Sequence, residues 1–448
     1  RPLGMYHVYT SVWFSAIYLL LLISLIGCIV PRIVSHAKAL RRQPPRVPAR
    51  LDRLAAHASM TTSASAAEVS QRAQQWLTSH RYRFVVDDDG SLRAEAGRHR
   101  ETGNLVFHIF LVLVLVGVGW NTLWGFKGTS VVVEGQGFSN SITQYDEFKA
   151  GAMVDTDNLT PFSMKLRKFV VSFETGTVQR GAARSFDATV DLTMGGKTQT
   201  RDLQVNHPLR IGSTKVHLLG HGYAADVVVR DGDGKVAYSG PVVFLPQDAN
   251  FKSVGVIKVP DARPDRLAFQ GFFLPTGAIT AGGPTSLFPD ALNPQLYLTA
   301  WYGKPTVETG VPSNIYTLDT TGLTQVTNGK DKARFVLSPG QRYKLPDGKG
   351  SIQFNGWQRW AKIQVSQNPG LPLTFLSVVL SVAGLCVSLF SRSRRVWVRT
   401  IPGDDGLRVE IGGLDRSDSR SGAVDDVNSL LAALHGDSMS GDVGEEHS

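Results

Sequence analysis

The protein has 448 residues, a formal net charge of +9 and 42% hydrophobic residues. These averages, with a mean hydropathy of -0.06, are typical of a soluble protein, but the apolar residues are concentrated in three runs with almost no charge. The runs cover residues 12–30, 105–126 and 371–390. Each has about 20 residues, the length that a helix needs to cross the hydrocarbon core of a bilayer. These runs disfavour a soluble single-domain enzyme, and we expect a membrane protein with three transmembrane helices.

The cysteine content limits the chemistry of the region between the second and third runs. The two cysteines of the chain, Cys28 and Cys386, both lie inside apolar runs, and residues 127–370 contain none. The sequence therefore predicts no stabilising disulfide, no thiol-redox motif and no cysteine-rich metal site in that region. The basic pI of about 9.5 does not require a nucleic-acid partner, because the positive charge lies beside the membrane runs.

The distribution of lysine and arginine predicts the orientation of the spans, because cytoplasmic flanks carry an excess of these residues. Residues 31–104 carry thirteen basic against seven acidic residues, and four arginines follow closely after the third run. In the opposite flanks, 1–11 and 125–143, the only lysine or arginine residues are Arg1 and Lys127. We therefore expect residues 31–104 and 391–448 to be cytoplasmic, residues 127–370 to be extracytoplasmic, and the protein to lie in the cytoplasmic membrane.

The two cytoplasmic segments show little order in their sequence. Residues 31–104 are predicted to form a basic loop with one short helix over 65–80. The segment 391–448 is predicted to be a mostly disordered tail, because from Thr400 onward it is acidic and rich in Ser, Gly and Asp. The exception is a short apolar stretch over 427–434.

The extracytoplasmic region is typical of a β domain. Apolar and polar residues alternate from Phe186 to Met194, Gly195 and Gly196 follow, and a second run covers 197–205. This pattern predicts a β-hairpin, since two glycines allow the positive φ angles of a tight turn. Similar runs occur at 165–173, 215–219, 226–230, 251–259, 267–274, 296–302 and 352–365. We expect an antiparallel all-β domain of sandwich type over residues 127–370.

Most polar motifs in the sequence do not indicate a site. There is no phosphate-binding glycine loop and no nucleophile motif. His217 and His221 could ligate a metal in principle, but their spacing aligns two histidines only on a helix, and this segment reads as a strand followed by a turn. The sequence from Asp87 to Gly90 lacks the rest of a calcium loop, so a charged turn is the simpler interpretation.

His108 is the strongest candidate, since it lies inside the second apolar run. An ionisable residue in a spanning helix is costly unless it faces protein, water or a ligand. One interpretation is an interfacial histidine, about one turn from the helix end, that hydrogen-bonds a neighbour or a headgroup. The other is an axial ligand, because neutral imidazole binds haem iron well.

Several segments, in order, resemble the ResB (also CcsB) family of the System II cytochrome c biogenesis machinery. They are 5–14 (MYHVYTSVWF), 27–32 (GCIVPR), His108 at the head of its helix, 205–212 (VNHPLRIG), 364–372 (QVSQNPGLP) and 394–397 (RRVW). Family members carry a further spanning helix before the first of these segments. The resemblance therefore implies four spans if the sequence is N-terminally truncated.

The resemblance also implies a function. Such proteins act with a multi-helix membrane partner, of the ResC or CcsA type, which carries a Trp-rich haem-handling segment. The pair delivers haem across the cytoplasmic membrane and supports its attachment to apocytochrome c. This chain would be at most an accessory subunit of the haem-attachment complex, with haem as transported substrate and His108 as the residue carried over as an axial ligand. Cys28 would lie near the same membrane depth, where it could contact haem, although a buried, inert cysteine is the simpler interpretation.

Three other functions are open from the sequence. The chain could be a structural scaffold that stabilises the haem-handling partner without binding haem. A transporter is disfavoured, because three spans without inverted repeats make a poor pore. A signalling receptor is disfavoured as well, because the cytoplasmic parts contain no recognisable output module.

Overall fold

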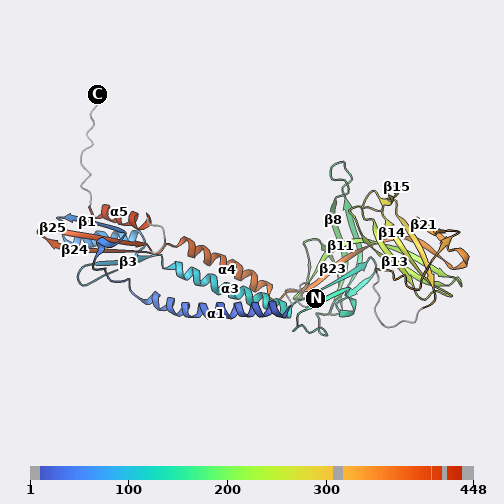
Figure 1. Ribbon diagram of the computed structural model, residues 1–448, viewed down its shortest axis with the longest axis horizontal. Coiled ribbons are helices and arrows are strands. Elements are labelled where there is room, and N and C mark those ends of the chain that lie inside the picture. Colours follow the sequence, from blue (N-terminus) through green and yellow to red (C-terminus); the bar gives the residue numbers. More distant parts are fainter. Residues whose placement is uncertain (1–10, 306–315, 405, 416–420, 436–448) are drawn as a thin grey trace, which may run out of the picture. The chain divides into compact units, whose positions relative to one another are not determined.

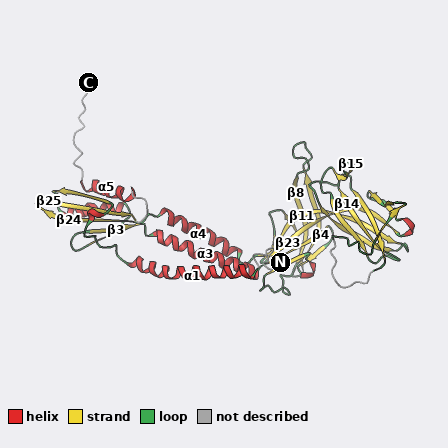
Figure 2. Ribbon diagram, viewed as in Figure 1, coloured by secondary structure: helices red, strands yellow, loops and turns green. Residues whose placement is uncertain are grey.

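A computed structural model of the protein describes residues 11–305, 316–404, 406–415 and 421–435 (Figures 1 and 2). The described residues form two compact units, one up to residue 119 and again from 370 onward, the other over 120–369. Residues 5–10, which carry part of the family resemblance, lie outside the described ranges, as do 416–420 and 436–448 of the expected tail.

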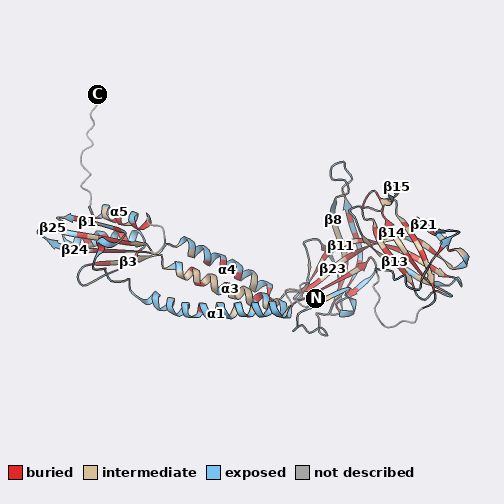
Figure 3. Ribbon diagram, in the orientation of Figure 1, coloured by how far each residue is buried: buried red, intermediate tan, exposed pale blue. Residues whose placement is uncertain are grey.

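Three helices in the described residues are long and apolar enough to cross a membrane: α1 (Val12–Arg41), α3 (His99–Trp124) and α4 (Leu371–Phe390). Much of the surface of α1 is exposed (Figure 3), including many of its leucines and isoleucines, as suits a helix surrounded by lipid. The Ser11 hydroxyl caps α1 by accepting a hydrogen bond from the Phe14 amide. Unlike the expected span over 12–30, α1 continues through Pro31 to a basic last turn with Lys38 and Arg41.

Small residues bring α3 and α4 close together. A Cβ atom on Gly384 would lie 2.7 Å from the Phe107 amide nitrogen, and one on Gly103 would lie 2.6 Å from the Ser388 nitrogen. The Ser381 hydroxyl, on the buried face of α4, donates a hydrogen bond to the Phe107 carbonyl at 3.2 Å. Glycine and serine contacts of this kind are typical of helices packed within a bilayer.

The first unit also contains a polar α+β domain. Its five-stranded antiparallel sheet has the order β1-β25-β24-β3-β2. The strands are β1 (Ala56–Thr62), β2 (Arg83–Val86), β3 (Leu92–Ala96), β24 (Arg394–Gly403) and β25 (Gly406–Asp415). Helices α2 (Ala66–Ser79) and α5 (Ser421–His435) share one buried apolar core with this sheet. The helix expected over 65–80 is therefore present as α2, with Ser65 and Glu68 forming a reciprocal N-terminal cap.

The tail prediction was wrong for its described part. Residues 394–415 form the central hairpin of the sheet, and α5 extends well beyond the apolar stretch expected over 427–434. Buried Val396, Val398, Val409 and Ile411 stabilise this order by packing against α2 and α5. Residues 31–104 are likewise more than a basic loop, since they supply three strands and α2 to the same domain.

The second unit, residues 120–369, is a β domain. Its larger sheet has twelve strands, with the central order β18-β17-β14-β13-β12-β11-β23-β4-β6 and with β10, β21 and β22 on side paths. A second sheet has the order β5-β7-β8-β9, and β15-β16 and β19-β20 form small hairpins. The ladders between these described strands are all antiparallel. The large antiparallel β-rich domain is thus confirmed, and its sandwich-type arrangement stays a prediction.

The strands of the β domain have the following bounds. In chain order they are β4 (Phe126–Val133), β5 (Gly137–Ser139), β6 (Glu147–Ala150), β7 (Ser163–Phe173), β8 (Ala183–Met194), β9 (Lys197–Gln204), β10 (Leu209–Ile211), β11 (Thr214–Asp231), β12 (Val236–Pro246), β13 (Ser253–Val259), β14 (Arg266–Leu274), β15 (Gly277–Thr280), β16 (Gly283–Ser286), β17 (Gln295–Gly303), β18 (Thr324–Gln325), β19 (Thr327–Asn328), β20 (Asp331–Lys332), β21 (Arg334–Leu337), β22 (Arg342–Lys344) and β23 (Gly350–Gln367).

Two long paired strands, β11 and β23, connect the two apolar cores of the β domain. The runs expected at 215–219 and 226–230 belong to this one strand, β11, which continues through Gly222. A Cβ atom on Gly222 would lie 2.4 Å from the Trp360 ring of β23. The indole nitrogen of Trp360 donates to the carbonyls of Tyr223 and Phe244, at 3.0 and 3.2 Å. Gly222, which interrupts the alternation, therefore leaves room for the buried side chain of Trp360.

The hairpin expected at Gly195 and Gly196 is confirmed. Strands β8 and β9 pair across these two glycines, whose φ angles are +53° and +75°. Ala188, Val190 and Leu192 of β8 face a core shared with β7, β11 and β23. The period-two pattern of the sequence thus identifies the buried face of the strand.

Replacement of Val190 by Asp should lower the free energy of unfolding of the β domain by about 3–5 kcal/mol, because the carboxylate would be buried without a partner. Val190 has no exposed surface. The matched control is Thr193→Asp, which places the same group on the other face of β8, where Thr193 contacts Thr198. Thermal unfolding of the purified variants measures the difference, and equal stability of the two would show that the assigned inward face is wrong.

Candidate functional site

Antiparallel contacts between α1 and α3 define the region around His108. The Tyr18 hydroxyl donates to the Leu115 carbonyl near one end of the pair. Near the other end, Arg32 forms an ion pair with Glu101 at 3.0 Å, and the His36 Nε2 lies 3.0 Å from the Thr102 hydroxyl. Since α4 packs on the same part of α3 through Gly103 and Gly384, the first turns of α3 lie between two other helices.

His108 lies in α3, nearly two helical turns beyond these polar contacts. Its side chain is half-buried, and its Nδ1 is 2.7 Å from the carbonyl oxygen of Asn104. A carbonyl can only accept, so we assign the proton of the neutral imidazole to Nδ1. The Nε2 atom then carries the lone pair that binds a metal such as haem iron. The Phe107 ring packs edge-on against the imidazole, with 4.9 Å between the two ring centroids.

The hydrogen bond to Asn104 also satisfies the simpler interpretation, an interfacial histidine paired with a neighbour. It does not exclude metal binding, because it occupies the nitrogen that a ligand does not need. The same kind of contact orients metal-binding histidines in proteins, where the second ring nitrogen donates to a carbonyl or a carboxylate. The geometry therefore permits His108 to act as an axial ligand.

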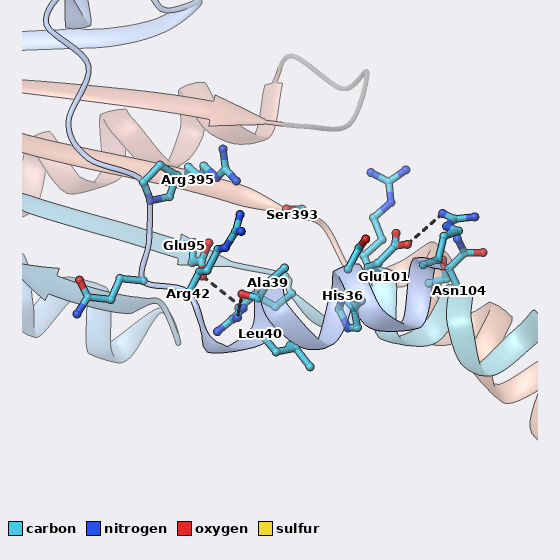
Figure 4. A pocket seen from close by; sticks show the side chains of 17 residues that line it. His36, Ala39, Leu40, Arg42, Glu95, Glu101, Asn104, Ser393 and Arg395 are labelled. Carbon is cyan, nitrogen blue, oxygen red and sulfur yellow. Dashed lines mark hydrogen bonds and ion pairs between the residues drawn. The ribbon is translucent and has the colours of Figure 1, made fainter. Parts of the chain in front are cut away.

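A polar pocket of about 1010 Å³ lies at the polar ends of α1 and α3, within the first unit (Figure 4). Asn104, whose carbonyl receives the His108 hydrogen bond, is one of its lining residues. His36 and Arg42 line it from α1 and its C-terminal cap, and Arg395 lines it from β24 (Figure 4). The pocket thus begins one turn of α3 away from the imidazole.

Sequence reasoning missed this pocket and His36. Its lining residues come from three distant segments, 32–45, 95–104 and 388–395. One local signal existed: Arg32 and His36 are four residues apart, so they lie on one face of α1. Nothing in the sequence pattern indicates that residues 388–395, around the start of β24, also line this pocket.

His217 and His221 do not form a joint metal site. On β11 they are separated by a bulge, and they pair with Gln364 and Ala361 of β23, three residues apart. Residues an odd number apart on a strand point to opposite faces, so the two imidazoles diverge. Among the residues that the structure describes, no group of three or more potential ligands could hold a metal ion.

His221 lies instead in an aromatic cluster of the β domain. Its ring stacks on Phe251 at 4.6 Å between centroids and lies 5.2 Å from the Phe186 ring. Burial, with a smaller effect of the nearby Arg359 charge, lowers the pKa of His221 to about 4. The imidazole is therefore neutral at physiological pH, and its environment is that of a core residue.

The remaining candidates have structural explanations. Asp89 accepts hydrogen bonds from the Ser91 amide and hydroxyl, which closes the turn between β2 and β3. This is the charged turn that the sequence suggested for 87–90. Cys28 and Cys386 lie on α1 and α4, and both are exposed free thiols rather than buried ones.

Comparison with known proteins shows which proteins this chain resembles. The chain is similar to proteins named cytochrome c biogenesis protein CcsB. The relative from Synechococcus sp. (strain JA-3-3Ab) is 24% identical over 401 residues, which cover 88% of this chain and 71% of the relative. Those from Microcystis aeruginosa (strain NIES-843 / IAM M-2473) and Synechococcus sp. (strain WH7803) are 21% and 24% identical, and the matches cover 77% and 79% of their lengths and 92% and 91% of this chain.

The family model agrees with these relatives over almost the whole sequence. It describes a ResB-like family and matches residues 1–424, which include the three apolar helices, the β domain and the five strands of the α+β domain. The ordered segments that resembled ResB proteins all lie within this range. The chain therefore belongs to the ResB-like family.

Proposed function

We propose that the chain acts in cytochrome c biogenesis, as a membrane subunit that binds haem through His108 and delivers it across the cytoplasmic membrane. The names of its relatives support the process. The observation that carries the haem step is the imidazole of His108, which has a carbonyl-bound Nδ1 and lies inside an apolar helix beside a polar pocket. Such a nitrogen ligand, together with apolar surroundings for the ring, suits haem.

The chemistry of the side chains supports a division of labour with a partner. Thioether formation requires the thiols of apocytochrome c, and this chain supplies an iron ligand but neither a Cys-x-x-Cys motif nor a Trp-rich segment. In our proposal a ResC- or CcsA-like multi-helix protein handles haem on the far side. The β domain of this chain then supports that site or holds the apocytochrome.

The proposed orientation has the α+β domain in the cytoplasm and the β domain outside. The basic residues of 31–104 support it, because such residues favour the cytoplasmic flank. His108 would then lie in the cytoplasmic half of α3, on the side from which haem enters.

Cysteine labelling tests this orientation. In a variant with Cys28 and Cys386 replaced by Ser, a single cysteine at Ser141 should react with a membrane-impermeant maleimide in intact cells. One at Ser63 should react only after the cells are lysed, because our proposal places it inside. Both residues lie outside the three long apolar helices. Labelling of Ser63→Cys in intact cells would reverse the orientation.

The proposed function is tested by purifying the chain with its partner and recording the absorption spectrum. We expect a haem Soret band that depends on His108. In the alternative function, the chain is a scaffold that stabilises the partner and never contacts haem. A complex that keeps its full haem content when His108 is replaced would select the scaffold.

A further inference from the structure

The pocket at the polar ends of α1 and α3 has an excess of positive charge. Five arginines line it, against two glutamates. Arg98 forms an ion pair with Glu95 at 3.3 Å, and Arg32 forms one with Glu101 at 3.0 Å. These pairs use both glutamates.

Two of the other arginines have no acidic partner within the described part of the chain. The side chains of Arg42 and Arg100 are exposed and form no ion pair with any described residue. Arg42 is the residue that ends α1, and Arg100 lies in the first turn of α3. The helices therefore bring two guanidinium groups from distant parts of the sequence to one polar cavity.

The pocket and His108 lie at successive depths of the same helix. Asn104 lines the pocket, and His108 follows it by four residues, which is about 6 Å along a helix axis. Between the arginines and the imidazole, the chain passes from polar residues into the apolar segment that begins at Leu105. A ligand that binds both the arginines and His108 would have an anionic end for the arginines. Its apolar body would carry a metal ion for the imidazole.

We propose that this pocket binds the two propionate carboxylates of haem, with Arg42 and Arg100 as their main partners, while the porphyrin ring extends toward His108. The inference rests on the proposed function, because it assumes that this chain binds haem. Guanidinium groups suit the task, since their planar donors match a carboxylate and keep their charge at any physiological pH. The volume of about 1010 Å³ is sufficient for the carboxylate end of a ligand of this size.

An acidic phospholipid headgroup carries similar chemistry and also lies at the ends of spanning helices. Two observations favour haem. Asn104, which lines the pocket, is hydrogen-bonded through its carbonyl to His108 Nδ1, so that Nε2 is left for a metal ion, which a phosphate headgroup lacks. Beyond the apolar part of the helices, the pocket also reaches Glu95 of β3, Ser393 just before β24 and Arg395 of β24 (Figure 4).

The test compares haem with its dimethyl ester, which has the same ring and iron but no carboxylate charge. The probes are titrated into the full chain, purified with its partner in detergent, and binding is followed by absorption. For the wild type we expect haem to bind about tenfold more tightly than the ester, as two partly exposed ion pairs would give. In the double variant Arg42→Gln/Arg100→Gln this preference should disappear, while affinity for the ester is unchanged.

The matched control is Arg46→Gln/Arg53→Gln, which removes the same charge from exposed arginines outside the pocket lining. It should keep the wild-type preference for haem, and Arg42→Lys/Arg100→Lys should keep part of it. Circular dichroism reports whether each variant is folded. If the glutamine variant does not fold, the wild type alone decides, since equal affinity for haem and ester overturns the proposal.

The remaining outcomes are distinct. A glutamine variant that keeps its preference for haem but loses co-purified acidic phospholipid would identify a headgroup site and overturn the inference. Haem binding that depends on His108 but not on the arginines would overturn the inference and leave the proposed function intact. A wild-type complex that binds neither haem nor the ester would overturn the proposed function itself.

Discussion

Replacement of His108 by Ala should weaken haem binding at least about 10- to 100-fold. Loss of a residue that only hydrogen-bonds a metal ligand already lowers metal affinity by roughly this factor, and loss of the ligand itself should cost at least as much. The change removes the only iron ligand that we assign to this chain. It should leave the amount of folded protein near normal, because the half-buried imidazole is replaced by a smaller apolar group near the end of an apolar segment. Soret absorbance per mole of purified complex and the level of mature c-type cytochrome in cells measure the two effects.

Added imidazole should partly restore both values, because a small ligand can occupy the axial position that His108 leaves. The matched control is His57→Ala, which removes an exposed histidine of β1 whose Nδ1 is hydrogen-bonded to the Leu54 carbonyl. It should change neither haem content nor cytochrome level. A His108→Ala complex with full haem content and normal cytochrome maturation would contradict the ligand assignment and favour a scaffold.

Replacement of Gly384 by Leu should separate α3 from α4 and destabilise the helix bundle by about 3 kcal/mol, since overpacking displaces backbone as well as side chains. A Cβ atom at this position would already lie 2.7 Å from the Phe107 amide nitrogen and 2.9 Å from the Gly103 carbonyl oxygen. Because His108 follows Phe107 directly, the displacement should also lower haem content. Thermal unfolding in detergent and the Soret absorbance report the two results.

Gly27→Leu is the control for this change. A Cβ atom on Gly27 of α1 would have no neighbour within 4 Å, so leucine there should be tolerated and should raise helix propensity. If both substitutions reduced stability equally, the effect would come from membrane insertion rather than from the contact between α3 and α4.

The elements that the sequence predicts well are those whose pattern is local. The helix α2 carries its own start signal in Ser65 and Glu68, and β8 shows its buried face through strict alternation around Val190. The three long apolar helices are equally visible, because each follows from one continuous apolar run of the length that a bilayer requires. In these cases neighbouring residues contain the information.

The elements that the sequence missed depend on distant partners. β25 alternates between buried Val409 and Ile411 and polar neighbours, but its composition resembles that of a disordered tail. Its order comes from pairing with β1, more than 300 residues earlier in the chain. The arginine pocket is hidden for the same reason, since no local pattern shows that Arg42, Arg100 and Arg395 meet.

The construction of the α+β domain from both ends of the chain has a consequence for biosynthesis. When the ribosome has made β1, α2, β2 and β3, the two central strands of their sheet do not yet exist. About 300 further residues must be translated first, which takes on the order of 15–60 s at typical elongation rates. Throughout that interval β1 and β3 expose unpaired edges that invite wrong pairing or chaperone binding. Only a nascent chain translated through β25 can close this sheet, so premature termination anywhere before it leaves the first-made strands as a target for proteolysis.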